Sequence, residues 1–314
     1  MNQIGRYLDE LVQRASAVYT CSVEVIRQAI LAIDQYETYS LPKRIGGFRT
    51  ITVVPESLLQ LQRYLNRGLQ PIYEELLADN QLTDTVHGFV AGRSAYTNAF
   101  RHRDGRTFII CDLKGAFDQI TEARLLTLFY SIEFDPGIAE LTVRLVTHKG
   151  VIPQGAPTSP VLLNLCLLEF DQLMMAVAFK HGYTYTRYAD DLCFSDDTLW
   201  PIDPKVVLQD IQFVARSLGF MLNEKKTRLL HVDKGAVKVT GCTISPDRVL
   251  QIALPRRTLK MYRAMLHRAT QGLVSHEVVM GTMGWVKIVY NGQVPQLLLE
   301  QLTKYQSLRD QGLL

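Results

Sequence analysis

The chain has 314 residues, of which 47% are hydrophobic and 21% charged, and its formal net charge is +3. This composition is typical of a globular protein large enough for two or three subdomains. No apolar run reaches membrane-spanning length and the first residues lack a signal-peptide core, so we expect a cytoplasmic protein with no membrane partner. The five cysteines show no metal-site or disulfide spacing, which favours a reducing compartment.

The first part of the chain has a helical pattern followed by a hairpin pattern. Apolar residues recur every three or four positions, so we expect an N-terminal helical segment over residues 1–40. The stretch Leu41–Pro55 then contains a Gly-Gly turn and an alternating strand. Lys43 and Arg49 lie beside this turn and are candidates for binding a triphosphate or a template backbone. An ordinary surface hairpin is the alternative.

The stretch His87–His102 combines a glycine-bounded turn with the start of a helix. Ser94 is suited to cap that helix. Asn98 and His102 are four residues apart and therefore share one helix face. We interpret them as candidate RNA contacts, and a surface pair without a ligand is the alternative.

The segment Thr107–Asp112 is a continuous apolar run that ends in a carboxylate. Such a run is typical of a buried central strand whose end opens onto a site. Phe117 follows five residues after Asp112. A bulky ring beside a nucleotide site would exclude a sugar that bears a 2′-hydroxyl, although a packing role is the default for any phenylalanine.

A rigid Pro/Gly loop, Pro153–Pro160, leads into a strongly apolar stretch, Val161–Phe179, for which we expect one helix. A helix that begins at such a loop presents backbone N–H groups to a phosphate. Gln154 in this loop is a candidate for contact with an incoming nucleotide. A generic loop–helix junction is the alternative.

The stretch Tyr183–Ser195 predicts a strand, a tight turn and a second strand, with Asp190 and Asp191 at the tip. Adjacent carboxylates repel each other and are best tolerated beside a cation or in water. Asp112 adds a third acid at the end of another strand. Strand-borne carboxylates that converge on one place are suited to hold two Mg²⁺ ions for phosphoryl or nucleotidyl transfer, and solvated turns are the alternative.

The remaining sequence predicts a helix from Asp203, alternating strands up to Ile252, and a basic helical end. Lys226, or its neighbour Lys225, is a candidate for protonating a leaving pyrophosphate or for neutralising its charge. Basic residues are clustered near the start of the last segment, which indicates contact with a phosphate backbone, and a solvated helix face is the alternative. These residues are Arg256, Arg257, Lys260 and Arg263.

Taken in order, these motifs resemble those of reverse transcriptases. The resemblance covers nearly the whole chain from Leu41 onward and depends on the order of the motifs, since one short motif alone is weak. The motifs are the Lys/Arg hairpin, the aspartate-ending strand with Phe117, the Pro-Gln-Gly loop, Tyr-Ala-Asp-Asp at 188–191, and the basic helical end. Asn98-Ala99-x-x-His102 and Val239-Thr240-Gly241 are similar to the NAxxH and VTG elements of bacterial retron enzymes.

The resemblance implies an α+β, right-hand polymerase fold with fingers, a palm built on a central antiparallel sheet, and a helical thumb. It implies fingers at 41–105 and 121–152, a palm at 106–120 and 153–253, and a thumb at 254–314. Asp112, Asp190 and Asp191 would be catalytic and would hold two Mg²⁺ ions, for which Mn²⁺ is a substitute. The implied nucleotide contacts are Lys43, Arg49, Phe117, Gln154 and Lys226. The implied contacts with RNA or primer are Asn98, His102, Val239, Thr240, Gly241 and the four basic thumb residues.

The implied activity is RNA-directed DNA synthesis from deoxynucleoside triphosphates on a cognate structured noncoding RNA, giving an RNA–DNA hybrid. Resemblance to retrons further implies priming from a 2′-hydroxyl, anti-phage defence and a separate effector protein. Two alternatives stay open. One is a bacterial reverse transcriptase that is not part of a retron, and the other is a non-catalytic RNA-binding scaffold.

Overall fold

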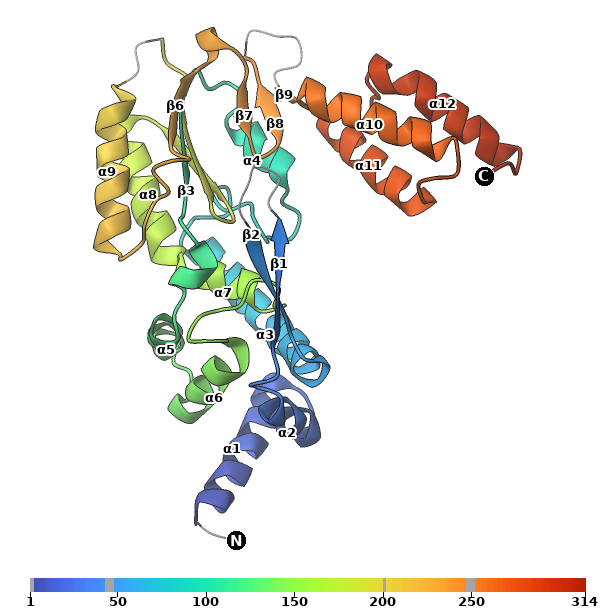
Figure 1. Ribbon diagram of the computed structural model, residues 1–314. Helices are drawn as coiled ribbons and strands as arrows, with labels where there is room; N and C mark the ends of the chain where they lie inside the picture. Colours follow the sequence, from blue (N-terminus) through green and yellow to red (C-terminus); the bar gives the residue numbers. More distant parts are fainter. Residues whose placement is uncertain (1–2, 43–47, 200–201, 247–251) are drawn as a thin grey trace. The chain divides into compact units, whose positions relative to one another are not determined.

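The computed structural model describes residues 3–42, 48–199, 202–246 and 252–314 (Figure 1). The chain divides into two compact units, which we describe separately. Unit 1 consists of Met1–Thr85, Leu113–Met174 and Gln212–Leu222. Unit 2 consists of Val86–Asp112, Met175–Ile211 and Asn223–Leu314.

Unit 1 is mainly helical and contains the predicted N-terminal helices. Its longest helix is α3 (Glu56–Asp79), whose leucine row from Leu58 to Leu69 is buried. The other helical elements are α1 (Gln3–Tyr19), α2 (Val23–Leu31), η1 (Ala116–Gln119), α5 (Glu122–Ser131), α6 (Pro136–Val146) and α7 (Ser159–Cys166). Helix α1 is anchored to α6, because the hydroxyl groups of Tyr19 and Thr142 are 2.7 Å apart.

The predicted hairpin of unit 1 is formed by β1 (Glu37–Pro42) and β2 (Phe48–Val53), which pair antiparallel. Lys43 lies between them, outside the described residues. The Pro/Gly loop contacts β2, since the amide of Thr52 donates to the carbonyl of Gln154 at 2.9 Å. A Cβ atom on Gly155 would lie 2.6 Å from the carbonyl oxygen of Thr52, and the φ of Gly155 is +120°. Only glycine can therefore occupy this close approach.

The predicted single helix over Val161–Phe179 is wrong in one respect. The segment forms two helices, α7 and α8 (Leu168–His181), bent by 51° at a break after Cys166. At this break the amide of Leu167 donates to the carbonyls of Leu163 and Asn164. Periodicity does not show this bend, because apolar residues cover most faces of the segment.

Unit 2 is built on a four-stranded antiparallel sheet in the order β4-β5-β3-β6. The predicted central strand and acidic hairpin are confirmed. The strands are β3 (Thr107–Asp112), β4 (Thr184–Tyr188), β5 (Asp191–Asp196) and β6 (Arg228–His231). Strand β3 is buried along nearly its whole length, as its apolar sequence predicts.

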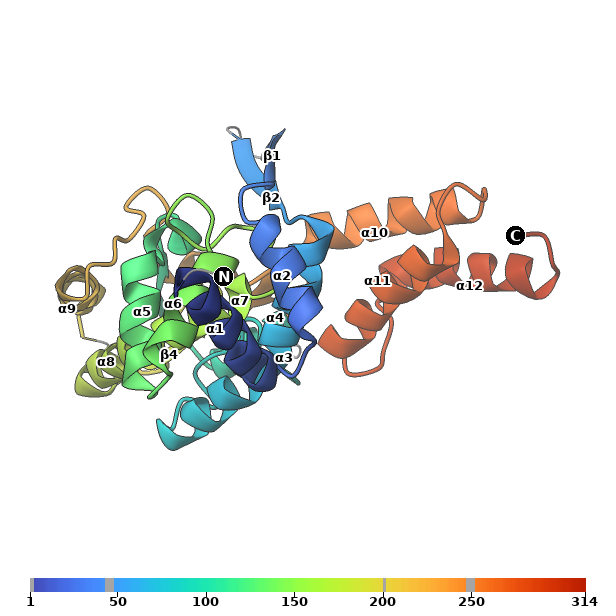
Figure 2. The same ribbon diagram turned by 90° about the horizontal axis from the view of Figure 1, so that it is seen from below.

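A second, three-stranded sheet in unit 2 contains β7 (Val237–Val239), β8 (Cys242–Ile244) and β9 (Ile252–Ala253). The short helix α4 (Ala95–Arg101) packs against β7 and β8, and Ser94 caps it as predicted, within a capping box. The chain ends in three helices that pack together (Figure 2). They are α10 (Arg256–Ala269), α11 (His276–Val289) and α12 (Gln296–Asp310).

One hydrophobic core runs through unit 2. It connects Phe108 and Cys193 of the first sheet with Val239 and Ile244 of the second. It continues into the three terminal helices through Leu266, Val279, Met283, Leu298 and Tyr305. The two sheets and the terminal helices therefore share their stabilising contacts.

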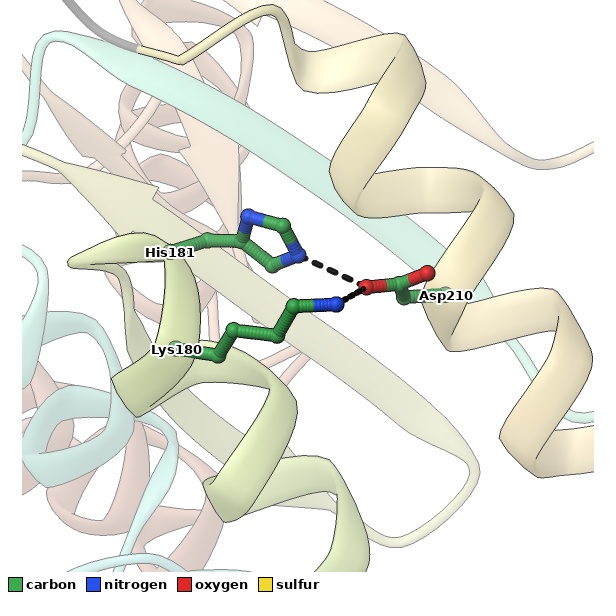
Figure 3. A network of polar contacts seen from close by, with 3 residues as sticks. All are labelled: Lys180, His181 and Asp210. Carbon is green, nitrogen blue, oxygen red and sulfur yellow. Dashed lines mark hydrogen bonds and ion pairs between the residues drawn. The ribbon is translucent and has the colours of Figure 1, made fainter.

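The last turn of α8 is tied to α9 (Pro204–Ser217) by a polar network (Figure 3). Lys180 Nζ and His181 Nε2 lie 2.7 and 2.8 Å from the same carboxylate oxygen of Asp210. These contacts hold the two helices side by side within unit 2.

No single helix in the described ranges has the length and apolar character to cross a bilayer. The bent pair α7–α8 meets that test jointly, by length and composition only.

Candidate active site

The predicted acidic residues gather at one end of the first sheet. Strands β3 and β5 pair so that Asp112 lies directly opposite Asp191. Strand β4 meets β5 at the pair Tyr188 and Asp191, so only Ala189 and Asp190 form the turn between them. The backbone of Ala189 is left-handed, with a φ of +57°, as two-residue hairpin turns require. The sheet thus brings two carboxylates together, with the third on the adjacent turn.

Asp112 is buried, 4% exposed, and is held by two side chains that follow the helix α9. Its carboxylate accepts hydrogen bonds from Lys226 Nζ at 2.6 Å and from Asn223 Nδ2 at 3.2 Å. The amide of Asn223 also donates to the backbone carbonyl of Asp112 at 2.7 Å. The hydrogen bond to Asp112 is the main reason why the pKa of Lys226 is raised, so this amine stays protonated.

The pKa of the Asp191 carboxyl group is raised in this setting. Its side chain keeps some access to solvent. The pKa of the carboxyl group is nevertheless raised to about 6, and the largest cause is the partial loss of water around it. The charges of Asp190 and Asp112 raise the pKa further, whereas Lys226 and Lys238 lower it. A bound cation would relieve this repulsion.

The donor atoms fit a hard divalent cation such as Mg²⁺, which prefers carboxylate oxygens. Within the described ranges, however, no three His, Cys, Asp or Glu side chains are arranged to hold a metal ion. Lys226 Nζ lies against one oxygen of Asp112, where a metal ion would compete with it. The carboxylate oxygens therefore suit such an ion chemically. One oxygen of Asp112 is bonded to the ammonium group of Lys226, which would have to give way to the ion.

A cavity of about 950 Å³ adjoins these acids within unit 2. Asp112, Asp191 and Lys226 line one part of it, and Asn98 and Val239–Gly241 line another. Further basic side chains line the same space: Lys205, Arg228, His231, Lys234 and Lys238. A cavity with acids at one place and cations around it is suited to a polyanion whose reacting end lies at the acids.

The two short motifs singled out in the sequence contact each other. Asn98 Nδ2 lies 3.4 Å from the Thr240 hydroxyl, which donates to the carbonyl of Ala95 at 2.9 Å. Thr240 and Gly241 form a turn with positive φ angles. The side chain of Val239 is buried in the core, so its contribution at this turn is to packing.

Asn98 and His102 are each only 1% exposed. The ring nitrogens of His102 lie 2.7 Å from the hydroxyls of Ser195 and Thr186, on the two strands of the acidic hairpin. The structure thus gives both side chains partners inside the protein. Their contact with RNA stays a prediction.

The other predicted nucleotide contacts belong to unit 1, whereas the acids belong to unit 2. Phe117 lies in η1 and is half-buried, and Gln154 is exposed in its loop. The backbone of Arg49 pairs with Leu41 in the hairpin.

The four basic residues predicted to bind nucleic acid lie on α10 and are exposed. Arg263 is 3.7 Å from Glu300 of α12, an exposed ion pair. Helix α10 packs through Leu266 and Ala269, so its basic side chains stay on the solvent side. This face of the helix is positively charged.

Sequence reasoning missed two polar residues beside the acids. Asn223 bonds Asp112 through both its side chain and its backbone. Arg187, three residues before Asp190, is completely buried. A charged residue inside a strand of tyrosine and threonine next to two acids was the signal for Arg187, because a buried charge needs partners.

Comparison with known proteins bears on the family and the fold. The family model described as reverse transcriptase (RNA-dependent DNA polymerase) matches residues 41–244. The retron Mx65 reverse transcriptase of Myxococcus xanthus is 33% identical over 286 residues, covering 84% of this chain and 64% of the relative. The retron Ec86 reverse transcriptase of Escherichia coli is 29% identical over 270 residues, covering 85% and 80%. This chain spans only 54% of a second Myxococcus xanthus relative, the retron Mx162 reverse transcriptase, to which it is 32% identical.

Among solved structures, telomerase from Candida albicans, determined with a fragment of telomeric RNA, superimposes with a TM-score of 0.53. The two sequences are 13% identical, and the match covers 88% of this chain and 56% of the telomerase chain. This likeness confirms the predicted α+β polymerase fold, and the retron relatives confirm the resemblance drawn from the motifs. The chain belongs to the reverse transcriptase (RNA-dependent DNA polymerase) family.

Proposed function

We propose that this chain is an RNA-directed DNA polymerase of the retron type. The observation that carries the proposal is the direct pairing of Asp112 with Asp191 at the end of the sheet, in a chain of this family. The retron relatives support the type, and the basic cavity supports a polyanionic substrate. On this proposal the chain copies a structured noncoding RNA into DNA.

The acids have one role in this proposal. Asp112, Asp190 and Asp191 would hold two divalent ions, Mg²⁺ or its substitute Mn²⁺. When bound, such ions supply the positive charge that stabilises the attacking and leaving oxygens of nucleotidyl transfer. The register of β3 and β5 orients two of the carboxylates, and Asn223 keeps Asp112 in place.

Lys226 has a second role. Its protonated amine, now bonded to Asp112, is free to exchange that partner for the phosphates of a deoxynucleoside triphosphate, since 59% of its side chain is exposed. There it would neutralise the leaving pyrophosphate or give it a proton. We assign further nucleotide contacts to Lys43, Arg49, Phe117 and Gln154, with Phe117 excluding ribonucleotides.

The nucleic acid would follow the basic cavity and the exposed face of α10. The turn Val239–Gly241 would position the primer, and Arg256, Arg257, Lys260 and Arg263 would contact the phosphates of the structured RNA and of the RNA–DNA hybrid. Asn98 and His102 would support this path or contact the RNA. The proposal extends to the palm, fingers and thumb boundaries expected from the sequence.

The retron type adds priming from a 2′-hydroxyl of the cognate RNA, a role in anti-phage defence with a separate effector protein, and a cytoplasmic location. The free state of all five cysteines is consistent with a reducing compartment.

The decisive experiment compares wild-type protein with Asp190→Asn. The variant should lose magnesium-dependent DNA synthesis on a primed RNA and keep its affinity for RNA. Asp210→Asn is the matched control, because it makes the same chemical change at the α8–α9 network (Figure 3) and should leave synthesis unchanged. Synthesis by Asp190→Asn at the wild-type rate would refute the assignment of the acids.

The retron type is tested by purifying the protein from its host and sequencing the bound nucleic acid before and after ribonuclease treatment. A short DNA joined covalently to one structured RNA is expected. Extension of any primed RNA without a preferred partner would instead indicate another kind of reverse transcriptase. RNA binding without synthesis would indicate a scaffold.

A further inference from the structure

Arg187 on β4 is the largest side chain that is completely buried in the described part of the chain, with 0% exposure. A guanidinium group carries five N–H donors and cannot lose its charge, so burying it is costly unless its donors are used inside the protein. Its neighbours along the strand are Thr186 and Tyr188, and the acidic turn begins directly afterwards. A buried arginine at this place therefore needs a structural explanation.

One hydrogen bond of Arg187 is made to the acidic turn itself. Its Nη1 donates to the backbone carbonyl of Ala189 at 3.1 Å. That carbonyl belongs to the peptide that connects Ala189 to Asp190. Ala189 has a φ of +57°, a conformation that costs energy for a residue with a Cβ atom and persists where surrounding contacts hold it. The guanidinium group is one such contact.

The segment Val86–Gly88 braces the same turn through the backbone. Val86 forms a parallel bridge with Arg187, and the amide of His87 donates to the carbonyl of Arg187 at 2.8 Å. A Cβ atom on Gly88 would lie 2.1 Å from the amide nitrogen of Ala189 and 2.9 Å from the carbonyl carbon of Tyr188. No real Cβ atom fits there, so the backbone of residue 88 lies directly against the turn.

We propose that Arg187 is a positioning residue that, together with the backbone of Gly88, fixes the peptide between Ala189 and Asp190. This peptide sets the direction in which the carboxylates of Asp190 and Asp191 point toward a divalent cation. This inference rests on the proposed function, which assigns the acids to metal binding. The turn is held by a hydrogen-bond donor and by close packing of the backbone. Loss of the donor frees the carbonyl of Ala189 and lets the peptide rotate.

The direct test measures Mn²⁺ binding by electron paramagnetic resonance, which needs no activity. Arg187→Met keeps the length and apolar stem of the side chain but removes the donors. Its Mn²⁺ affinity should fall at least tenfold. Phe194→Leu is the matched control, because it weakens the core of the neighbouring strand, where Phe194 stacks on Tyr185, without touching the turn. Wild-type Mn²⁺ affinity in Arg187→Met would overturn the proposal.

A variant that keeps the charge covers the case in which Arg187→Met fails to fold. Arg187→Lys retains one donor group, and its Mn²⁺ affinity should fall about threefold or more. An unchanged affinity in a folded Arg187→Lys protein would also overturn the proposal. Because a merely structural role would lower thermal stability alone, melting temperatures are compared with those of Phe194→Leu.

Activity gives an independent readout. In Arg187→Met the Mg²⁺ concentration for half-maximal synthesis should rise and kcat should fall, while KM for the deoxynucleotide and the affinity for RNA stay unchanged. A rise in KM for the deoxynucleotide with normal Mg²⁺ dependence would contradict the positioning role. If wild-type protein binds Mn²⁺ but synthesises no DNA, the proposed function fails, and the Mn²⁺ comparison still decides the role of Arg187.

Discussion

His102 should make the stability of unit 2 depend on pH. Burial is the largest cause that lowers the pKa of this residue to about 3, and the nearby His87 and Arg101 lower it further. The folded protein therefore keeps the ring neutral, bonded to Ser195 and Thr186. In the unfolded chain the pKa returns to its ordinary value of 6.5. Between these two values the unfolded state binds one proton more than the folded state.

The magnitude follows from proton linkage. Stability is complete above pH 6.5 and falls by about 1.4 kcal/mol for each pH unit below it, until the folded ring also takes up a proton near pH 3. Between pH 8 and pH 5 the loss attributable to His102 is about 2 kcal/mol. For a urea dependence of about 2–3 kcal/mol per molar, this corresponds to a shift of roughly 0.7–1 M in the unfolding midpoint.

The assay is urea unfolding at pH 8 and pH 5, with hydrogen exchange of β4 and β5 to assign the transition to unit 2. The comparison protein is His102→Gln, which keeps a hydrogen-bonding side chain but cannot titrate in this range. Its overall stability is expected to be lower at both pH values. The pH-dependent loss should be about 2 kcal/mol smaller than in wild type. Equal losses in the two proteins would refute the reasoning.

Three further predictions concern nucleotide choice, RNA binding and packing. Phe117→Ala should raise ribonucleotide incorporation about tenfold or more in a competition assay, and unchanged discrimination would remove its role as a gate. Replacing Arg256, Arg257 and Lys260 by Ala should weaken RNA binding and reduce the slope of log affinity against log salt concentration by about 2. An unchanged slope would show that these residues of α10 do not contact RNA phosphates. Thr240→Val removes the donor to Ala95 and should cost about 1–2 kcal/mol of unfolding free energy in urea, so wild-type stability would contradict that contact.

The elements that sequence predicts well are those encoded by short-range patterns. The apolar run ending at Asp112 and the alternation on both sides of Asp190 and Asp191 specify two strands and a tight turn, and the structure has them at those places. Ser94 caps its helix because a hydroxyl group at that position satisfies a free amide. The sequence alone thus predicts Asp112 at the end of one strand and Asp190 with Asp191 at the tip of a hairpin.

The rest depends on packing between segments distant in sequence. The helical spacing of Asn98 and His102 puts them on one face, but only the fold shows that this face is buried against Thr240 and the acidic hairpin. Likewise, Asn223 reaches Asp112 across 111 residues of sequence. No proline or glycine in the sequence marks the bend after Cys166. No periodicity encodes such partners.

The continuous core of unit 2 affects how this protein can be divided for experiments. A fragment that ended after β9 would lose the helices that cover Val237, Ile244 and Leu254 in the shared core. It would also lose the Tyr290 hydroxyl, which accepts the hydrogen bond of the Leu254 amide at 3.1 Å. The newly bared apolar side chains favour self-association over a soluble, shortened enzyme. Truncation at the expected palm–thumb boundary should therefore yield aggregates, and expression trials are better started with the terminal helices in place.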